Sequence, residues 1–151
     1  MKKLTCAIIS ALAVTVSLSA QAVSPAVSNL QTHWAEVNYT LTGKAQSKAF
    51  EALITEANEA VSIAPNQADV LIWRGIIHSS YAGIKGGLGA LSLAKTAKAD
   101  LETALKLDNK ALDGSAYTTL GTLYYKVPGW PVGFGDDDKA EDLLATALKL
   151  N

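Results

Sequence analysis

Apolar residues recur along most of this chain at intervals of three and four positions, the period of an α-helix with one buried face. Val27, Leu30 and Trp34 begin the first series, and Ser24 followed by Pro25 supplies an N-cap with proline in the first turn. Prolines and glycines divide the rest into segments. No alternating strand pattern exceeds four residues. The sequence predicts an all-α fold with helices over about 26–42, 44–63, 67–82, 89–107, 111–126 and 137–150.

Three of these segments repeat one spacing of small and apolar residues. Each places a small or apolar residue first, an apolar residue four positions later and an alanine three positions after that. Such self-similarity indicates stacked helical units. The three sets are Leu53, Ala57 and Ala60; Ala97, Leu101 and Ala104; and Ala140, Leu144 and Ala147.

The helices before the last two of these segments each contain a central glycine, Gly75 and Gly121. Two helices approach closely only where a side chain is absent. We therefore expect Gly75 to lie against the turn at Ala97 and Gly121 against the turn at Ala140, with leucines filling the layer between units. An alanine-rich bundle without repeats has similar spacing and stays the alternative.

This pattern resembles the tetratricopeptide repeat (TPR), whose first helix reads W-x2-L-G-x2-Y and whose second carries A-x3-F-x2-A before a proline. Tyr117, Leu120, Gly121 and Tyr124 match the first helix with tyrosine in place of tryptophan. The resemblance covers about residues 45–151 and implies a right-handed stack of antiparallel helix pairs. The strings GGLGALSLAK, ALDGSAY and VPGWPVGFGDDDKA are similar to small exported bacterial members, distant relatives of the T component of tripartite ATP-independent periplasmic (TRAP) transporters.

The units of this chain are longer than those of the family. Ala104 lies 44 residues after Ala60, and Ala147 lies 43 residues after Ala104, against about 34 for the repeat. The excess falls between the two helices of each unit, in GIKGGLGALSL and VPGWPVGFGDDD. We therefore expect a TPR-like solenoid with insertions at the intra-repeat turns.

The first 22 residues have the pattern of a secretory signal peptide. Lys2 and Lys3 precede an apolar run that ends in small residues, with an A-x-A pattern from Ala20 to Ala22. The run is about 15 residues long, short of the roughly 20 that span a bilayer, so an uncleaved membrane anchor is the weaker alternative. We expect a signal peptide over 1–22, a mature helical domain over 23–151 and export to the periplasm of a Gram-negative cell.

Loss of that segment changes the cysteine count and the charge. Cys6 is the one cysteine and lies within the segment, so the mature chain has no disulfide and no cysteine metal site. Without Lys2 and Lys3, 11 basic residues face 14 acidic ones, a formal net charge of −3. This charge argues against nucleic-acid binding.

The C-terminal end of the pattern lacks the polar cap with which solenoids normally finish. Leu143, Leu144 and Leu148 would then leave apolar surface of the last helix in water. Two explanations are open: truncation of the gene product, and a partner that covers this helix.

Candidate catalytic groups do not assemble in the sequence. Asp136, Asp137 and Asp138 form an acidic run, but calcium loops alternate their acidic residues, so we interpret the run as the N-cap of the last helix. His33 and His78 lack a partner at helical metal-site spacing, and no G-K-[ST] or G-x-S-x-G motif is present. We expect no enzyme, metal or cofactor. A metal-dependent enzyme built on the aspartates is a disfavoured alternative.

The favoured function is non-catalytic binding of a peptide or protein segment by an exported scaffold. The alternative is accessory binding of a small apolar or anionic molecule for a periplasmic transporter. In the resemblance, a groove lined by the first helix of each pair holds the ligand. The candidate groove residues are Asp69, Ile72, Ile76, Ser79, Ser115, Thr118, Thr122 and Tyr125.

The loop PGWPVGFG adds two further candidates, Trp130 and Phe134. Rigid aromatic side chains are efficient contact residues in protein interfaces. The favoured interpretation is nevertheless that the loop folds back and buries both rings over the hairpin end, with direct partner contact as the alternative.

Overall fold

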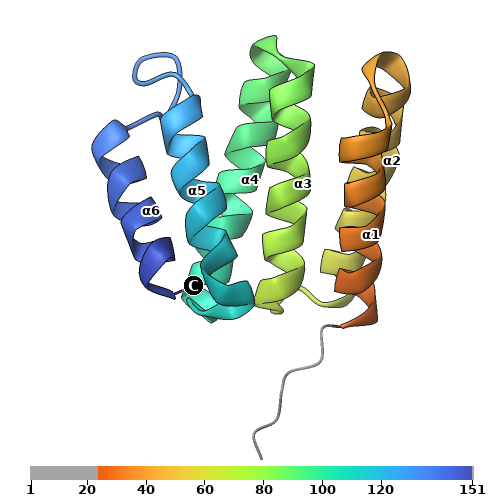
Figure 1. The fold of residues 1–151 in the computed structure, drawn as a ribbon, viewed down its shortest axis with the longest axis horizontal. Helices are drawn as coiled ribbons and strands as arrows, with labels where there is room; N and C mark the ends of the chain where they lie inside the picture. The colour runs from red at the N-terminus through yellow and green to blue at the C-terminus, as the bar shows by residue number, and fades with distance from the viewer. Residues whose placement is uncertain (1–23, 151) are drawn as a thin grey trace, which may run out of the picture.

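The computed structural model describes residues 24–150, and the expected signal peptide lies outside the described residues. Within this range the chain forms six α-helices and no strand, which confirms the predicted all-α class (Figure 1). A short 3-10 helix, η1, precedes α5. The elements are α1 (Pro25–Thr40), α2 (Gly43–Ile63), α3 (Ala68–Lys85), α4 (Gly87–Leu107), η1 (Ala111–Gly114), α5 (Ser115–Lys126) and α6 (Asp137–Leu150).

Consecutive helices run in opposite directions and form three hairpins, α1–α2, α3–α4 and α5–α6 (Figure 1). The first helices of the hairpins contact one another in order, because α1 packs on α3 and α3 packs on α5. Helix α3 also contacts α2 and α4, so it lies at the centre of the stack. Its buried positions are Ala68, Val70, Leu71, Ile72, Gly75, Ile77, His78, Tyr81 and Ala82.

Two glycines allow the helices of two hairpins to cross closely. A Cβ added at Gly75 would lie 2.8 Å from Leu101 Cγ and 3.4 Å from the carbonyl oxygen of Ala97. A Cβ added at Gly121 would lie 2.9 Å from Leu144 Cγ and 3.2 Å from the carbonyl oxygen of Ala140. Side-chain carbons do not approach this closely, so both crossings need glycine. The predicted glycine contacts are confirmed.

Local signals set several helix ends as predicted. The Ser24 side chain accepts a hydrogen bond from the Val27 N–H at 3.3 Å and caps α1. Helix α2 ends at Ile63, just before Pro65. The Asp136 carboxylate accepts from a backbone N–H in the first turn of α6 at 3.0 Å, which confirms the capping role of the acidic run.

The α3–α4 connection differs from the expected glycine-rich insertion. Helix α3 continues through Gly83 to Lys85, and α4 begins at Gly87, so Gly86 is the one residue between the two helices. Gly86 and Gly87 make the turn with φ values of +66° and +61°. A glycine inside a helix costs only about 1 kcal/mol relative to alanine, which hairpin packing readily offsets. Residues expected in a glycine-rich loop therefore belong to α3 and α4, whereas the α5–α6 connection is a long loop.

The start of α5 also differs from the prediction of one helix over 111–126. The first four residues form η1, and inside it Leu112 and Asp113 have φ values of +49° and +52°. The helix is interrupted where Leu112 packs against the core. The helical period of the sequence does not encode this tertiary contact.

Candidate functional site

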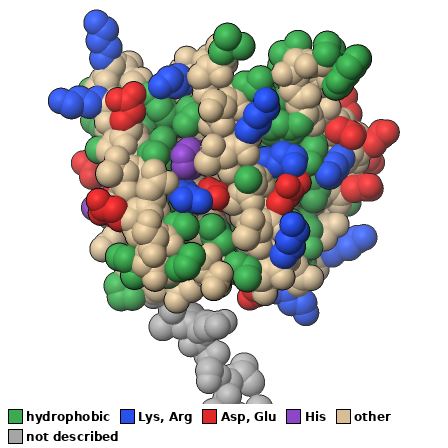
Figure 2. Space-filling view, turned by 180° about the vertical axis from the view of Figure 1, so that it is seen from behind, with side chains coloured by type: hydrophobic (Ala, Val, Ile, Leu, Met, Phe, Trp, Pro, Cys, Tyr) green, Lys and Arg blue, Asp and Glu red, His purple; other side chains and the backbone are tan. Residues whose placement is uncertain are grey.

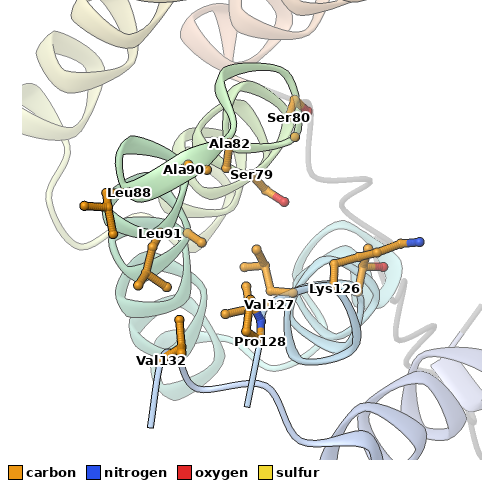
Figure 3. A pocket seen from close by; sticks show the side chains of 15 residues that line it. Ser79, Ser80, Ala82, Leu88, Ala90, Leu91, Lys126, Val127, Pro128 and Val132 are labelled. Atoms are coloured by element: carbon orange, nitrogen blue, oxygen red, sulfur yellow. The ribbon is translucent and has the colours of Figure 1, made fainter. Parts of the chain in front are cut away.

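A cleft of about 810 Å³ opens at one end of the stack, between the α3–α4 turn and the C-terminal end of α5 (Figure 3). Its walls come from the end of α3, the start of α4, the end of α5 and the connection over residues 127–136, here called the 127–136 loop. Most of the lining is apolar. The bulkiest apolar side chains in it are Leu88, Leu91, Leu123, Val127, Pro128 and Val132.

The cleft exists because two hairpins with the same crossing differ in length. From its crossing glycine, α3 continues from Gly75 to Lys85, whereas α5 continues only from Gly121 to Lys126. The α3–α4 hairpin therefore extends past the end of α5. Its facing side carries the small residues Ala82, Gly83 and Gly87, so the space beyond α5 is not filled.

Close backbone contacts fix the 127–136 loop that closes one side of the cleft. Gly129 and Gly135 form an isolated β-bridge. The Asp136 N–H donates to the Tyr124 carbonyl at 3.0 Å and ties the loop to α5. A Cβ at Gly135 would collide with the carbonyl oxygen of Val127. This position therefore requires glycine, and the loop has one defined path.

The two aromatic rings of the loop have opposite environments. Phe134 is half-buried and packs edge-on against Tyr124, with the ring centroids 5.4 Å apart. Trp130 is 90% exposed. The interpretation that the hairpin end buries both rings is therefore wrong for Trp130, because this residue follows Gly129 at the outer tip of the bridged loop, where no helix covers it.

Four polar side chains line the cleft, and two of them already have protein partners. Ser80 Oγ accepts from the Trp34 indole N–H at 2.9 Å, and the Thr122 hydroxyl donates to a backbone carbonyl of α5 at 2.8 Å. Ser79 and Lys126 complete the set. Lys126 is the one charged residue of the lining, but its side chain points away from the cleft in Figure 3, and its ammonium lies 5.1 Å from the centroid of the Tyr125 ring.

The predicted groove residues divide into three groups. Ile72 is fully buried, so its assignment to the groove is corrected: α3 turns this position into the core. Ile76 packs against the core as well and is only partly exposed. Ser79 and Thr122 line the cleft. The others lie elsewhere on α3 and α5, with partly or largely exposed side chains: Asp69, Ser115, Thr118 and Tyr125.

An ion pair that the sequence analysis missed joins α3 to α4. Arg74 donates through Nε and Nη2 to the two oxygens of the Asp100 carboxylate, at 2.8 and 2.6 Å. Asp100 is buried and Arg74 is half-buried. The sequence contained a signal for this pair. Gly75 faces Leu101 across the hairpin, Arg74 directly precedes Gly75, and Asp100 directly precedes Leu101.

His78 lies beside this ion pair and is buried. Its Nδ1 is 3.0 Å from the Arg74 carbonyl oxygen. Burial lowers the pKa of His78 below 6.5, and the backbone hydrogen bond and the Asp100 charge oppose this shift only partly. No serine, threonine or cysteine side chain hydrogen-bonds to it among residues 24–150, so the ring has the environment of a neutral core histidine.

The back of the molecule carries charges of both signs. On the face seen in Figure 2, basic and acidic side chains interleave over its middle. The Lys98 ammonium lies 2.8 Å from a Glu102 carboxylate oxygen, and this hydrogen bond raises the pKa of Lys98. In the described part of the chain, no three His, Cys, Asp or Glu side chains come together as a metal site would require.

No protein-family model matches the chain, and no curated protein matches it significantly. Among the helices of residues 24–150, none has the length and hydropathy needed to cross a membrane.

Proposed function

We propose that this protein is a non-catalytic binding protein whose cleft between the α3–α4 turn, α5 and the 127–136 loop holds a small, largely apolar ligand. The cleft itself carries the proposal. Its volume of about 810 Å³ lies within the roughly 300–1,000 Å³ of ligand sites, and such sites combine apolar walls with a few polar groups. The lining has this composition, with four polar residues among glycines and apolar side chains.

We place the protein, as part of the same proposal, among small exported bacterial TPR-like proteins distantly related to the TRAP-transporter T component. The equivalent glycine–leucine crossings at Gly75 and Gly121 support a repeat of two helices. Accessory ligand binding for a transporter in the periplasm fits this class. N-terminal sequencing of envelope protein tests the location: cleavage near Ala22 is expected, and an intact Met1 on cytoplasmic protein would overturn it.

Binding is tested by filling the cleft. Ala90 lines it, and Ala99, which is exposed on the same helix, provides a matched control. Purified protein is titrated with the neutral apolar dye N-phenyl-1-naphthylamine, whose fluorescence rises in apolar surroundings. Ala90→Trp should abolish the fluorescence increase, and Ala99→Trp should keep it. Equal dye binding by the two variants would refute the cleft as the ligand site.

A peptide or protein segment is the second candidate, and one observation favours it. Leu88 in the lining and Trp130 in the 127–136 loop are 88% and 90% exposed, as contact residues of an interface are before the partner binds. If a peptide is the ligand, Trp130→Ala should weaken binding of apolar peptides and leave the dye affinity unchanged. If peptide affinity is unaffected by Trp130→Ala, this candidate fails.

A further inference from the structure

Among residues 24–150, no side chain places a charged group inside the cleft. No acidic residue of this range lines it. Lys126 is its one basic residue, but the ammonium group lies over the Tyr125 ring, which is not part of the lining, and the side chain points away from the cleft (Figure 3). A charged group on a bound ligand would therefore meet no counter-charge from these side chains.

The other polar groups of the lining are three hydroxyls. Those of Ser80 and Thr122 already bond to the protein. The third belongs to Ser79, and in Figure 3 it points from α3 toward α5. A hydroxyl both donates and accepts hydrogen bonds, so it can serve a neutral group such as an alcohol or an ester. It does not replace the hydration of a full charge.

The walls of the cleft are apolar on both sides. In Figure 3, Leu88 and Leu91 project from α4, and Val127 and Pro128 lie across from them at the end of α5. A ligand that fills the space between them loses contact with water along these walls. Moving an ionised group into such surroundings without a partner is strongly unfavourable.

We propose that the ligand is uncharged: a molecule with an apolar body whose polar groups are neutral, such as an alcohol or an ester. This inference rests on the proposed function and narrows it. Of the two ligand classes left open by the sequence, apolar and anionic, it selects the apolar one. It also excludes amines and other cations.

Three ligands with the same saturated chain and different head groups test this inference. Decanol, decanoate and decylamine are each used to displace N-phenyl-1-naphthylamine from the purified protein at pH 8, where decanoate is an anion and decylamine a cation. Both charged ligands should bind at least about tenfold more weakly than decanol, because neither finds a counter-charge in the cleft. A charged ligand that binds as tightly as decanol would overturn the inference.

A cation added to the wall should change this selectivity. Ala90 lines the cleft, and Ala99 is exposed on the same helix and does not line it. Ala90→Lys should lower the ratio of the decanoate Kd to the decanol Kd about two- to fivefold, the effect of one solvent-exposed ion pair. The matched control Ala99→Lys should leave the ratio unchanged. An unchanged ratio in Ala90→Lys, with decanol still bound, would show that a missing counter-charge is not what excludes decanoate, and would overturn the inference.

The same titrations separate this inference from the proposed function. If decanol and a charged ligand bind equally well, the cleft stays the ligand site and only the neutral ligand class fails. If neither decanol nor the dye binds, the proposed function fails as well.

Discussion

The α3–α4 and α5–α6 hairpins share one packing arrangement and differ at their ends. In each, a glycine of the first helix meets a leucine of the second, as Gly75 meets Leu101 and Gly121 meets Leu144. Beyond this crossing the α3–α4 hairpin makes a tight turn between two long helices. In the α5–α6 hairpin, α5 ends early and the 127–136 loop follows. The shared crossing builds the frame of the molecule, and the unequal ends create its cleft.

The same register reveals a difference inside the two hairpins. Counted from the crossing glycines and leucines, Arg74 corresponds to Leu120 and Asp100 corresponds to Leu143. One hairpin therefore holds an ion pair where the other holds two leucines. Both solutions fill the position, but only the ion pair is vulnerable to the loss of one partner.

The largest expected effect comes from breaking that ion pair. Arg74→Leu alone leaves the buried Asp100 carboxylate without its partner, and we expect it to lower the free energy of unfolding by about 3 kcal/mol or more. The double substitution Arg74→Leu and Asp100→Leu reproduces the apolar pair of the other hairpin. It should recover most of the lost stability.

Urea denaturation of the three proteins measures this difference. If the double variant were as unstable as Arg74→Leu, the two hairpins would not be interchangeable at this position.

Alanine at the crossing glycines should have the next largest effect. Gly75→Ala places a Cβ 2.8 Å from Leu101 Cγ, and Leu101 is fully buried, so we expect a loss of about 1–3 kcal/mol. Gly121→Ala should cost less, because Leu144 is only partly buried and can move. Gly83→Ala is the control, since nothing lies within 4 Å of its Cβ, and it should raise stability by about 0.5–1 kcal/mol.

Thermal unfolding gives the order of these three glycine variants. A Gly75→Ala protein as stable as Gly83→Ala would contradict the close crossing of α3 and α4.

The loop aromatics should differ in their effect on stability. Phe134→Ala removes a ring that packs on Tyr124 and the core, and we expect a cost of about 1 kcal/mol or more. Trp130→Ala removes a ring that is 90% exposed and should change stability by less than about 0.5 kcal/mol. Equal losses in calorimetry would show that the loop buries both rings.

The smallest expected effect is a pH dependence at His78. Burial lowers its pKa in the folded protein below 6.5, between the opposing charges of Arg74 and Asp100. As the pH falls below 6.5, His78 therefore binds a proton more readily in the unfolded chain than in the folded protein. The contribution of neutral His78 to the free energy of unfolding is complete above pH 6.5 and is lost as the pH falls through the folded pKa.

Melting temperatures between pH 7.5 and 5.5 test this dependence. The decrease in melting temperature on acidification should be smaller in His78→Gln than in the unmodified protein. In the control His33→Gln, the decrease caused by His78 should remain. A decrease that is unchanged in His78→Gln would assign the dependence to other groups.

Much of the frame could be predicted from the sequence because its signals are local. Ser24 and Asp136 cap helices through their own side chains, and Pro65 follows the end of α2. The crossing glycines were visible through their spacing from the alanine and leucine positions. Each of these signals acts within a few residues or within one repeated unit.

The cleft could not be predicted, because it depends on contacts between units. The sequence does not reveal that α3 continues through Gly83, since a helix tolerates glycine where packing supports it. Nor does it reveal that Ile72 faces the core while Trp130 lies at the loop tip. Hairpin length and loop path together decide these positions, and neither follows from a hydrophobic period.

The central claim, that the ligand binds in the cleft between the unequal hairpin ends, is tested most directly by NMR. Amide chemical shifts of 15N-labelled protein are followed during titration with N-phenyl-1-naphthylamine. The largest changes should fall in residues 79–94 and 122–132, which contain the cleft lining. Changes concentrated instead at Asp69, Ser115 and Thr118, with the cleft unaffected, would locate the ligand in the groove along the first helices and contradict this account.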